Sequence, residues 1–206
     1  MPSQRRIGLT GGIASGKSSV GRWLSDYGLP VLDADRYARD ALAPGSAGCQ
    51  AVLERYGPAV AANGTQTDEV ELNRSALADI VFANAVERQW LEQLVHPLVR
   101  QAFDTALGEL EQTPAVVLMV PLLYESGLES LCTEIWVVHC SREQQQQRLI
   151  QRNRLSAQQA DQRIEAQWPL ARKCLLADQM NGNRGQPDPW TTNPGLPLER
   201  RNPVGA

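Results

Sequence analysis

Residues Gly11 to Ser18 form the stretch of this chain whose composition and spacing point most directly to chemistry. The stretch reads GGIASGKS and fits the pattern G-x-x-x-x-G-K-[ST] without a mismatch. Glycines let the backbone curl so that successive N–H groups point at phosphate oxygens, and a following helix adds its positive N-terminal end. Lys17 is expected to reach the β- and γ-phosphates, and the Ser18 hydroxyl to ligate Mg²⁺. The pattern therefore predicts a site for nucleotide phosphates.

The backbone of this loop and the residues just after it supply the predicted nucleotide contacts. A chance Gly-rich turn is the alternative. We favour the phosphate loop because the motif follows an apolar strand and opens a helical pattern, as its mechanism requires. Mg²⁺ is the expected cofactor. The predicted nucleotide-binding residues are Gly12, Ala14, Ser15, Gly16, Lys17, Ser18 and Ser19.

Two carboxylates follow the next apolar strand, in the sequence VLDAD that contains Asp33 and Asp35. Ligands of parallel α/β sheets collect beyond the carboxyl ends of the strands, so both side chains are expected near the γ-phosphate. One carboxylate can accept a proton from an attacking hydroxyl, and its neighbour can help to hold Mg²⁺. Solvated turn residues are the alternative for both. We predict that Asp33 is catalytic and that both residues bind substrate.

Arginines in the sequence QRLIQRNRLS form a third candidate group. Arg148 and Arg152 are four residues apart, so they lie on one face of a predicted helix. Guanidinium groups on a mobile segment could clamp the transferring phosphate, whose transition-state charge is spread over the equatorial oxygens. The alternative is a solvated helix face. We predict that Arg152 is catalytic.

Absent motifs narrow the class of phosphate-loop protein. A guanine-specific protein would be expected to carry N-K-x-D and D-x-x-G, and neither occurs. A switch or motor ATPase would be expected to carry an acidic residue after a later strand. The apolar run from Ala115 to Val120 instead continues into Pro121. These absences favour a kinase for a small molecule.

Composition and charge set broad limits on the function. The chain has 206 residues, a formal net charge of −3 and 42% apolar residues, which suits one globular core with an insertion. A mildly acidic protein with a pI near 5.5 is not expected to bind nucleic acid or an anionic membrane. The longest apolar run, Ala115 to Leu123, is far shorter than the ~20 residues that cross a bilayer. The first residues, MPSQRRIGLTGG, lack the apolar stretch that a signal peptide is expected to have. A cytoplasmic protein is expected.

The cysteines and histidines do not suggest a metal centre. Four cysteines lie far apart without a C-x-x-C pair, and the two histidines are His96 and His139. We predict reduced, mostly buried thiols.

The predicted elements form an α/β protein with a parallel sheet. Apolar, β-branched runs predict strands at 6–9, 31–32, 115–120 and 134–140, with a helix after the phosphate loop. Residues 36–112 are polar and helical in pattern, with one helix expected to begin near His96-Pro97. Ser141 is expected to cap a helix that ends near Asn153, and Ser156 another that could extend to Leu176.

These segments together resemble the dephospho-CoA kinase family over about residues 5–178. The resemblance rests on IGLTGGIASGKSSV, VLDAD, the block from Leu72 to Arg100 that contains HPLVR, VVLMVPLLYESGL, VVHCSREQQQQRLIQRN and AQWPLARKCLLAD. It implies a three-layer P-loop NTPase fold with a parallel sheet and a core at 1–35 and 113–185. It also implies a lid at about 148–172 and a helical acceptor-binding insertion at 36–112.

The resemblance also implies a reaction and further site residues. The reaction transfers the γ-phosphate of ATP to the ribose 3′-hydroxyl of dephospho-CoA, giving CoA and ADP, the last step of coenzyme A biosynthesis. Asp33 matches the proposed base and Arg152 a lid arginine, while His96 and Glu125 match acceptor-side or supporting positions. The expected partners are ATP and dephospho-CoA, without nucleic acid or membrane, in a monomer or weak homo-oligomer. A kinase for another small-molecule or nucleotide acceptor, or a non-catalytic nucleotide-binding regulator, remains the alternative.

The carboxyl end departs from this family. After Ala177-Asp178 the expected apolar strand signal is lost, although Asn183 and Gly185 of an Asn-x-Gly turn are kept. Five prolines occur from Gln186 onward and exclude a long helix. We therefore predict an irregular tail at 186–206.

Overall fold

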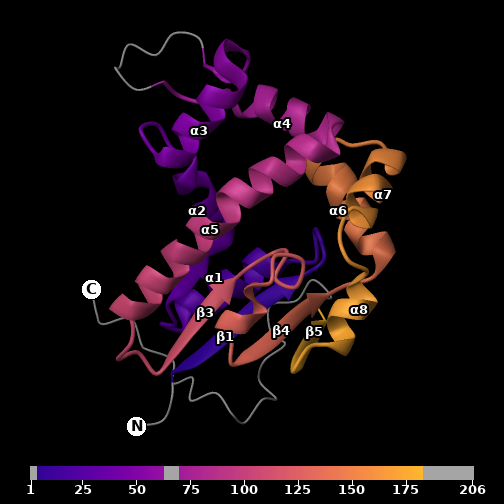
Figure 1. Cartoon of the computed structure of the whole chain (residues 1–206). Coiled ribbons are helices and arrows are strands. Elements are labelled where there is room, and N and C mark those ends of the chain that lie inside the picture. Colours follow the sequence, from indigo (N-terminus) through magenta and orange to yellow (C-terminus); the bar gives the residue numbers. More distant parts are fainter. Residues whose placement is uncertain (1–3, 63–69, 183–206) are drawn as a thin grey trace, which may run out of the picture. The chain divides into compact units, whose positions relative to one another are not determined.

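The computed structural model describes residues 4–62 and 70–182, and the predicted tail at 186–206 lies outside them. The chain divides into two compact units, one of residues 1–33 and 110–206 and one of residues 34–109. The described part of the first unit holds a five-stranded parallel sheet in the order β2-β3-β1-β4-β5 (Figure 1). Its strands are β1 (Arg5–Gly11), β2 (Val31–Asp33), β3 (Ala115–Met119), β4 (Glu134–His139) and β5 (Gln179–Gly182).

The three middle strands are buried on both faces, as their continuous apolar runs predict. On one face, the side chains without exposed surface are Ile7 and Leu9 of β1, Val117 of β3, and Trp136 and Val138 of β4, and they share one apolar cluster with Val20 and Leu24. On the opposite face, the side chains without exposed surface are Thr10 of β1, Val116 and Leu118 of β3, and Val137 of β4. The strand predictions at these positions are therefore confirmed.

Different segments cover the two faces of the sheet at β1. Leu9 lies near Gly21 of α1 (Lys17–Asp26), whereas a Cβ at the preceding residue, Gly8, would contact Leu123 and Cys132. Because successive strand residues point to opposite faces, α1 covers one face of β1 and the connection after β3, with η2 (Leu128–Leu131), covers the other.

The last helices of the first unit begin where the sequence predicts. Ser141 and Ser156 each form a capping box, at the start of α6 (Arg142–Asn153) and of α7 (Ala157–Glu165). The predicted continuation to Leu176 is wrong, because α7 ends at Glu165 and a separate helix, α8 (Leu170–Leu175), begins after Pro169.

Strand β5 is a second difference from the sequence prediction. The segment after Ala177-Asp178 lacks an apolar strand signal, yet residues 179–182 pair in register with β4, from Trp136 with Gln179 to His139 with Gly182. Backbone hydrogen bonds to β4 make this edge strand, since they do not depend on the apolar character of its side chains.

The second unit is helical and has its own apolar core, formed by residues such as Val52, Val60 and Leu77. The helix predicted to begin near His96-Pro97 begins earlier, so this prediction is wrong. Pro97 lies inside a continuous 25-residue helix that contacts α2 and α4 along its length. These contacts compensate for the backbone hydrogen bond that proline removes. The elements are α2 (Ala34–Ala41), α3 (Ala47–Tyr56), η1 (Gly57–Val60), α4 (Arg74–Ala83) and α5 (Ala85–Glu109).

No helix within residues 4–62 and 70–182 is both long enough and apolar enough to cross a membrane.

Candidate active site

The phosphate loop joins β1 to α1 and has the tight backbone curl that its glycines predict. Ser15 N donates to Gly12 O at 3.1 Å, and helix α1 begins at Lys17. Ala14 has φ = 57° and Gly16 has φ = 97°, both in the left-handed region. A left-handed non-glycine residue costs about 1–2 kcal/mol, so neighbouring contacts must stabilise Ala14.

The first two glycines of the loop are required by close packing. A Cβ at Gly11 would lie 2.4 Å from the carbonyl oxygen of Val138, and a Cβ at Gly12 would lie 2.4 Å from Gln145 Nε2. Real Cβ atoms do not approach so closely, so a larger residue at Gly11 would displace the loop from the β4 backbone, whereas one at Gly12 would displace the Gln145 amide.

The predicted phosphate-binding residues and Asp33 lie at one edge of the sheet. Gly11 ends β1, while Asp33 ends β2 and pairs in register with Met119 of β3. All these strands are parallel, so their carboxyl ends form one edge. Lys17 and Asp33 are half-buried there, whereas Ser18 and Ser19 are exposed in the first turn of α1. The fold therefore gathers these residues at one edge, as predicted.

Arg148 contacts the phosphate loop directly. One of its terminal guanidinium nitrogens, Nη1, donates to the carbonyl oxygens of Ala14 at 3.0 Å and of Ser15 at 3.3 Å. Arg152, one turn further along α6, is exposed, and its Nε donates to Asn153 Oδ1 at 3.0 Å. The two arginines thus differ in their surroundings, although both belong to α6.

Glu125 lies in a buried polar cluster after β3. Its Oε1 atom is 2.7 Å from Lys173 Nζ and accepts a hydrogen bond from the Trp168 backbone N–H at 3.0 Å. Its Oε2 atom is buried without a partner among the described residues. The neighbouring Tyr124 hydroxyl is likewise buried, and this burial raises its pKa to about 12. The ring of Tyr124 is parallel to that of Trp168, with centroids 6.1 Å apart.

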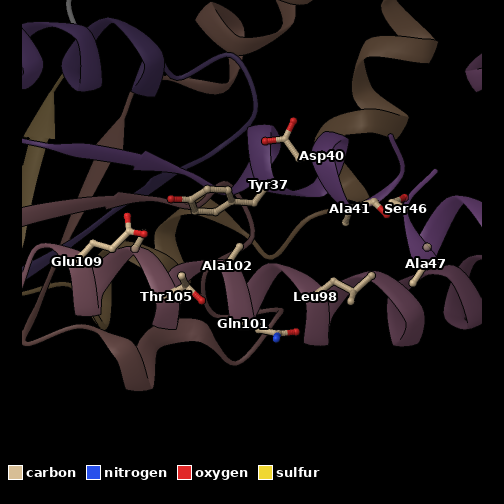
Figure 2. Close-up of a pocket in the computed structure, with 12 residues that line it drawn as sticks. Tyr37, Asp40, Ala41, Ser46, Ala47, Leu98, Gln101, Ala102, Thr105 and Glu109 are labelled. Atoms are coloured by element: carbon tan, nitrogen blue, oxygen red, sulfur yellow. Dashed lines mark hydrogen bonds between the residues drawn. The ribbon is translucent and has the colours of Figure 1, made fainter. Parts of the chain in front are cut away.

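Asp35 and His96 belong to the second unit and are exposed there. Asp35 lies in the first turn of α2, and His96 lies in the middle of α5. A pocket of about 520 Å³ lies between α2 and α5 (Figure 2), with Tyr37 and Glu109 near one end and Leu98 near the other. Helical spacing places His96 on a different face of α5 from Leu98. Neither predicted residue lines this pocket.

The described residues contain no cluster of three or more His, Cys, Asp or Glu side chains that could hold a metal ion. All four cysteines are free thiols, and burial raises the pKa of Cys132 to about 12. Ser18, the predicted metal ligand, is exposed in the first turn of α1.

The family model described as dephospho-CoA kinase matches residues 5–188, which include the phosphate loop, Asp33, Arg148 and the Glu125 cluster. The chain belongs to the dephospho-CoA kinase family. The dephospho-CoA kinase of Synechococcus sp. (strain CC9605) is 58% identical over 188 residues, which cover 91% of this chain and 89% of the relative. That of Prochlorococcus marinus (strain MIT 9313) is 57% identical over 188 residues, 91% of this chain and 92% of the relative.

Solved structures share the fold of this chain. A crystal structure from Thermus thermophilus, TT1252, is 34% identical, with a TM-score of 0.76 over 89% of this chain and 91% of that one. The fold is also that of the dephospho-CoA kinase from Campylobacter jejuni, with a TM-score of 0.63 and 24% identity over 88% and 89% of the two chains. The α/β fold of this dephospho-CoA kinase family member is thus matched nearly along its length.

Sequence reasoning missed two residues that contact the phosphate loop in this dephospho-CoA kinase family member. Gln145 donates to the Ile13 carbonyl oxygen, and Gln167 accepts from the Ile13 N–H. The capping box at Ser141 fixes the phase of α6 and so places Gln145 and Arg148 on one face, which is a signal that could have suggested Gln145. No local pattern marks Gln167, because it lies between two helices.

Proposed function

We propose that this protein transfers the γ-phosphoryl group of ATP to the ribose 3′-hydroxyl of dephospho-CoA, giving CoA and ADP. The observation that carries the proposal is the shared sheet edge at which β1 leads into the phosphate loop and β2 ends at Asp33. A phosphate-loop motif and a carboxylate at one sheet edge, in a member of the dephospho-CoA kinase family, support this reaction.

The phosphate loop would hold the donor. The N–H groups of the curled segment 12–19 and the N-terminal end of α1 supply positive potential for the β- and γ-phosphates. Lys17, the first residue of α1, would place its ammonium group against the same oxygens and stabilise the charge that gathers on them.

Mg²⁺ is the cofactor that we propose at this site. Ser18 is exposed in the first turn of α1, so its hydroxyl is available as an oxygen ligand. Oxygen ligands of this kind suit Mg²⁺, which usually keeps several waters. When bound, the ion would neutralise charge on the β- and γ-phosphate oxygens.

Asp33 is the proposed general base. Its carboxylate would accept the proton of the 3′-hydroxyl as that oxygen forms a bond to the γ-phosphorus. The bond between the γ-phosphorus and the β,γ-bridging oxygen breaks in the same transfer, and ADP leaves with that oxygen. Asp33 then returns the proton to solvent.

The remaining predicted residues have proposed roles on the acceptor or the transferring group. Asp35 and His96, both exposed in the second unit, would contact the acceptor. Arg152 would donate to the transferring phosphoryl oxygens, for which its exposed guanidinium is available. Glu125 would support the site, since Lys173 and Trp168 already use its Oε1 atom.

The test is a direct assay with the purified full chain, Mg²⁺, ATP and dephospho-CoA. Mass spectrometry should detect CoA, and ADP should be released only when dephospho-CoA is present. Lys17→Ala should give neither product while keeping the melting temperature. Adenosine, AMP and phosphopantetheine serve as competing acceptors in parallel reactions. Faster transfer to one of them would favour another acceptor, and ATP binding without transfer to any would favour a non-catalytic regulator.

A further inference from the structure

Ile13, in the middle of the phosphate loop, is held on both sides by glutamine side chains. Its backbone N–H donates to Gln167 Oε1 at 2.9 Å, and its carbonyl oxygen accepts a hydrogen bond from Gln145 Nε2 at 2.7 Å. Gln145 lies on α6, and Gln167 lies in the link between α7 and α8. Two separate segments of the first unit therefore hold one residue of the loop.

The two amide groups act with opposite hydrogen-bonding polarity. A backbone carbonyl can only accept, so Gln145 must present its NH₂ group to Ile13. A backbone N–H can only donate, so Gln167 must present its oxygen. Changing an amide to a carboxylate would therefore remove the donor at position 145 but keep the acceptor at position 167.

Gln145 is packed closely against the loop as well as bonded to it. The residue is only 4% exposed, and a Cβ at Gly12 would lie 2.4 Å from its Nε2 atom. The amide thus occupies the space that a side chain at position 12 would need. A buried amide must be hydrogen-bonded, and Ile13 O is the acceptor for its NH₂ group.

Side chains from α6 supply donors to three consecutive loop carbonyls. Gln145 binds that of Ile13, and Arg148 binds those of Ala14 and Ser15. A loop that turns its N–H groups toward a phosphate turns carbonyl oxygens away from it, and these oxygens need donors of their own. Gln145 and Arg148 therefore hold the loop from the side that faces away from the expected phosphate.

Gln167 is fixed in turn by the residue that follows it. The Trp168 N–H donates to Glu125 Oε1, which is paired with the fully buried Lys173 ammonium. Gln167, which accepts from the Ile13 N–H, is thus linked through the backbone of Trp168 to a buried ion pair of the same unit.

We propose that Gln145 and Gln167 are positioning residues that hold the phosphate loop in its nucleotide-binding conformation before ATP arrives. They bracket Ile13 and thereby stabilise the left-handed conformation of Ala14, the next residue. A preformed loop does not lose conformational freedom when the phosphates bind, so its ATP affinity is higher. The inference deepens the proposed function and rests on it only in that the loop binds ATP.

The test compares Gln145→Glu with Gln167→Glu, which add the same charge on either side of Ile13. The dissociation constant of Mg-ATP is measured by titration calorimetry without acceptor, together with the melting temperature of the ligand-free protein. Gln145→Glu should raise the ATP dissociation constant about tenfold or more, because a donor is lost and a carboxylate faces a carbonyl. Gln167→Glu should stay within about threefold of the wild type, because its acceptor is kept. Gln147→Glu, at an exposed position of α6, is the control for charge alone.

A neutral pair of variants tests both positions independently of charge and of folding. Gln145→Met and Gln167→Met each remove one hydrogen bond at similar length, and each should weaken ATP binding about fivefold with a melting temperature near that of the wild type. If the Gln145→Glu variant does not fold, the ATP affinities of the two Met variants test the proposal on their own. Equal ATP affinity in the two Glu variants, or wild-type affinity in both Met variants, overturns the proposal. Failure of the proposed function would instead appear as a wild-type protein that binds ATP but does not phosphorylate dephospho-CoA.

Discussion

Lys173 Nζ lies 2.7 Å from Glu125 Oε1, and the lysine side chain has no exposed surface. The ammonium group also donates to the Pro121 carbonyl at 3.3 Å, and this carbonyl accepts from Thr10 Oγ1 in β1. The buried Lys173 ammonium therefore connects α8 to the segment after β3, and the shared Pro121 carbonyl connects that segment to β1, the strand that leads into the phosphate loop.

Glu125→Gln should destabilise the protein more than Lys173→Met. The first leaves a fully buried ammonium without its counter-charge, at a cost of about 3–5 kcal/mol, whereas the second leaves a carboxylate that is 17% exposed. The double variant Glu125→Gln/Lys173→Met should lose less than the sum of the two. Urea unfolding of the three variants measures this, and additive losses would show that the pair is not coupled.

Asp33→Asn should reduce kcat about 10²-fold or more, because the proposed general base is lost. ATP affinity should change little, since the phosphate loop is untouched. Asp26→Asn is the matched control, because Asp26 is exposed at the far end of α1. Steady-state kinetics with ATP titration separate the two effects. Equal losses of ATP affinity and of kcat would indicate a metal or structural role for Asp33.

Arg152→Lys should lower kcat about tenfold although the charge is kept, because a point charge does not replace a planar, two-pronged donor. The melting temperature should not change, since Arg152 is exposed and, within the described part of the chain, its side chain donates to the neighbouring Asn153. Arg163→Lys on α7 is the control at another exposed arginine. Hydrogen exchange adds a second measurement, in which residues 148–171 should be more protected when ATP and acceptor are both bound. Unchanged turnover and exchange would remove Arg152 from the site.

Glu134 should contribute stability that depends on pH. Burial favours its protonated form, but hydrogen bonds from Arg5 at 2.7 and 3.1 Å and from Trp136 at 2.9 Å hold its pKa below the usual value. A lowered folded-state pKa means that the contribution is complete above the unfolded-state pKa of about 4.3 and is lost as pH falls through the folded value. Glu134→Gln should therefore cost about 1 kcal/mol at pH 7 and less at pH 3.5, as measured by urea unfolding. Glu129→Gln, at an exposed position, is the control. A loss that is independent of pH would contradict the assignment.

Asn181→Val should stabilise the protein by about 1–2 kcal/mol. The Asn181 side chain is 3% exposed, and neither of its polar atoms has a hydrogen-bond partner among the described residues. Valine would remove this desolvation cost and favours strands. Gln179→Val, at an exposed position of the same strand, measures strand preference alone. Equal midpoints in urea for the two variants would show that burial of the amide is not the cause.

Local patterns were sufficient to predict the parts of the fold that depend on nearby residues. The loop from Gly11 to Ser18, the buried strands beside it and the caps at Ser141 and Ser156 all follow from short spacings. Asp33 lies at the predicted sheet edge because parallel topology determines where a strand ends relative to its neighbours.

Features that depend on distant partners could not be predicted from such patterns. Helix α5 continues through Pro97 because other helices pack along it, and β5 forms because β4 supplies its hydrogen bonds. Gln145 and Gln167 reach Ile13 from more than 130 residues away in sequence. Their contacts with the loop depend on tertiary packing, which cannot be predicted from the spacing of nearby residues.

The place of β1 in the middle of the sheet has a consequence for synthesis on the ribosome. Its neighbours, β3 and β4, begin at Ala115 and Glu134, so they are made roughly 100 residues after Gly11. At about 5–20 residues per second, Ile7 and Leu9 wait on the order of 10 s for their first strand partner. The helical unit at 34–109 is contiguous and can form its local contacts within this interval. The central strand is thus the first to be translated, and it waits longer than β2 for its first partner, β3.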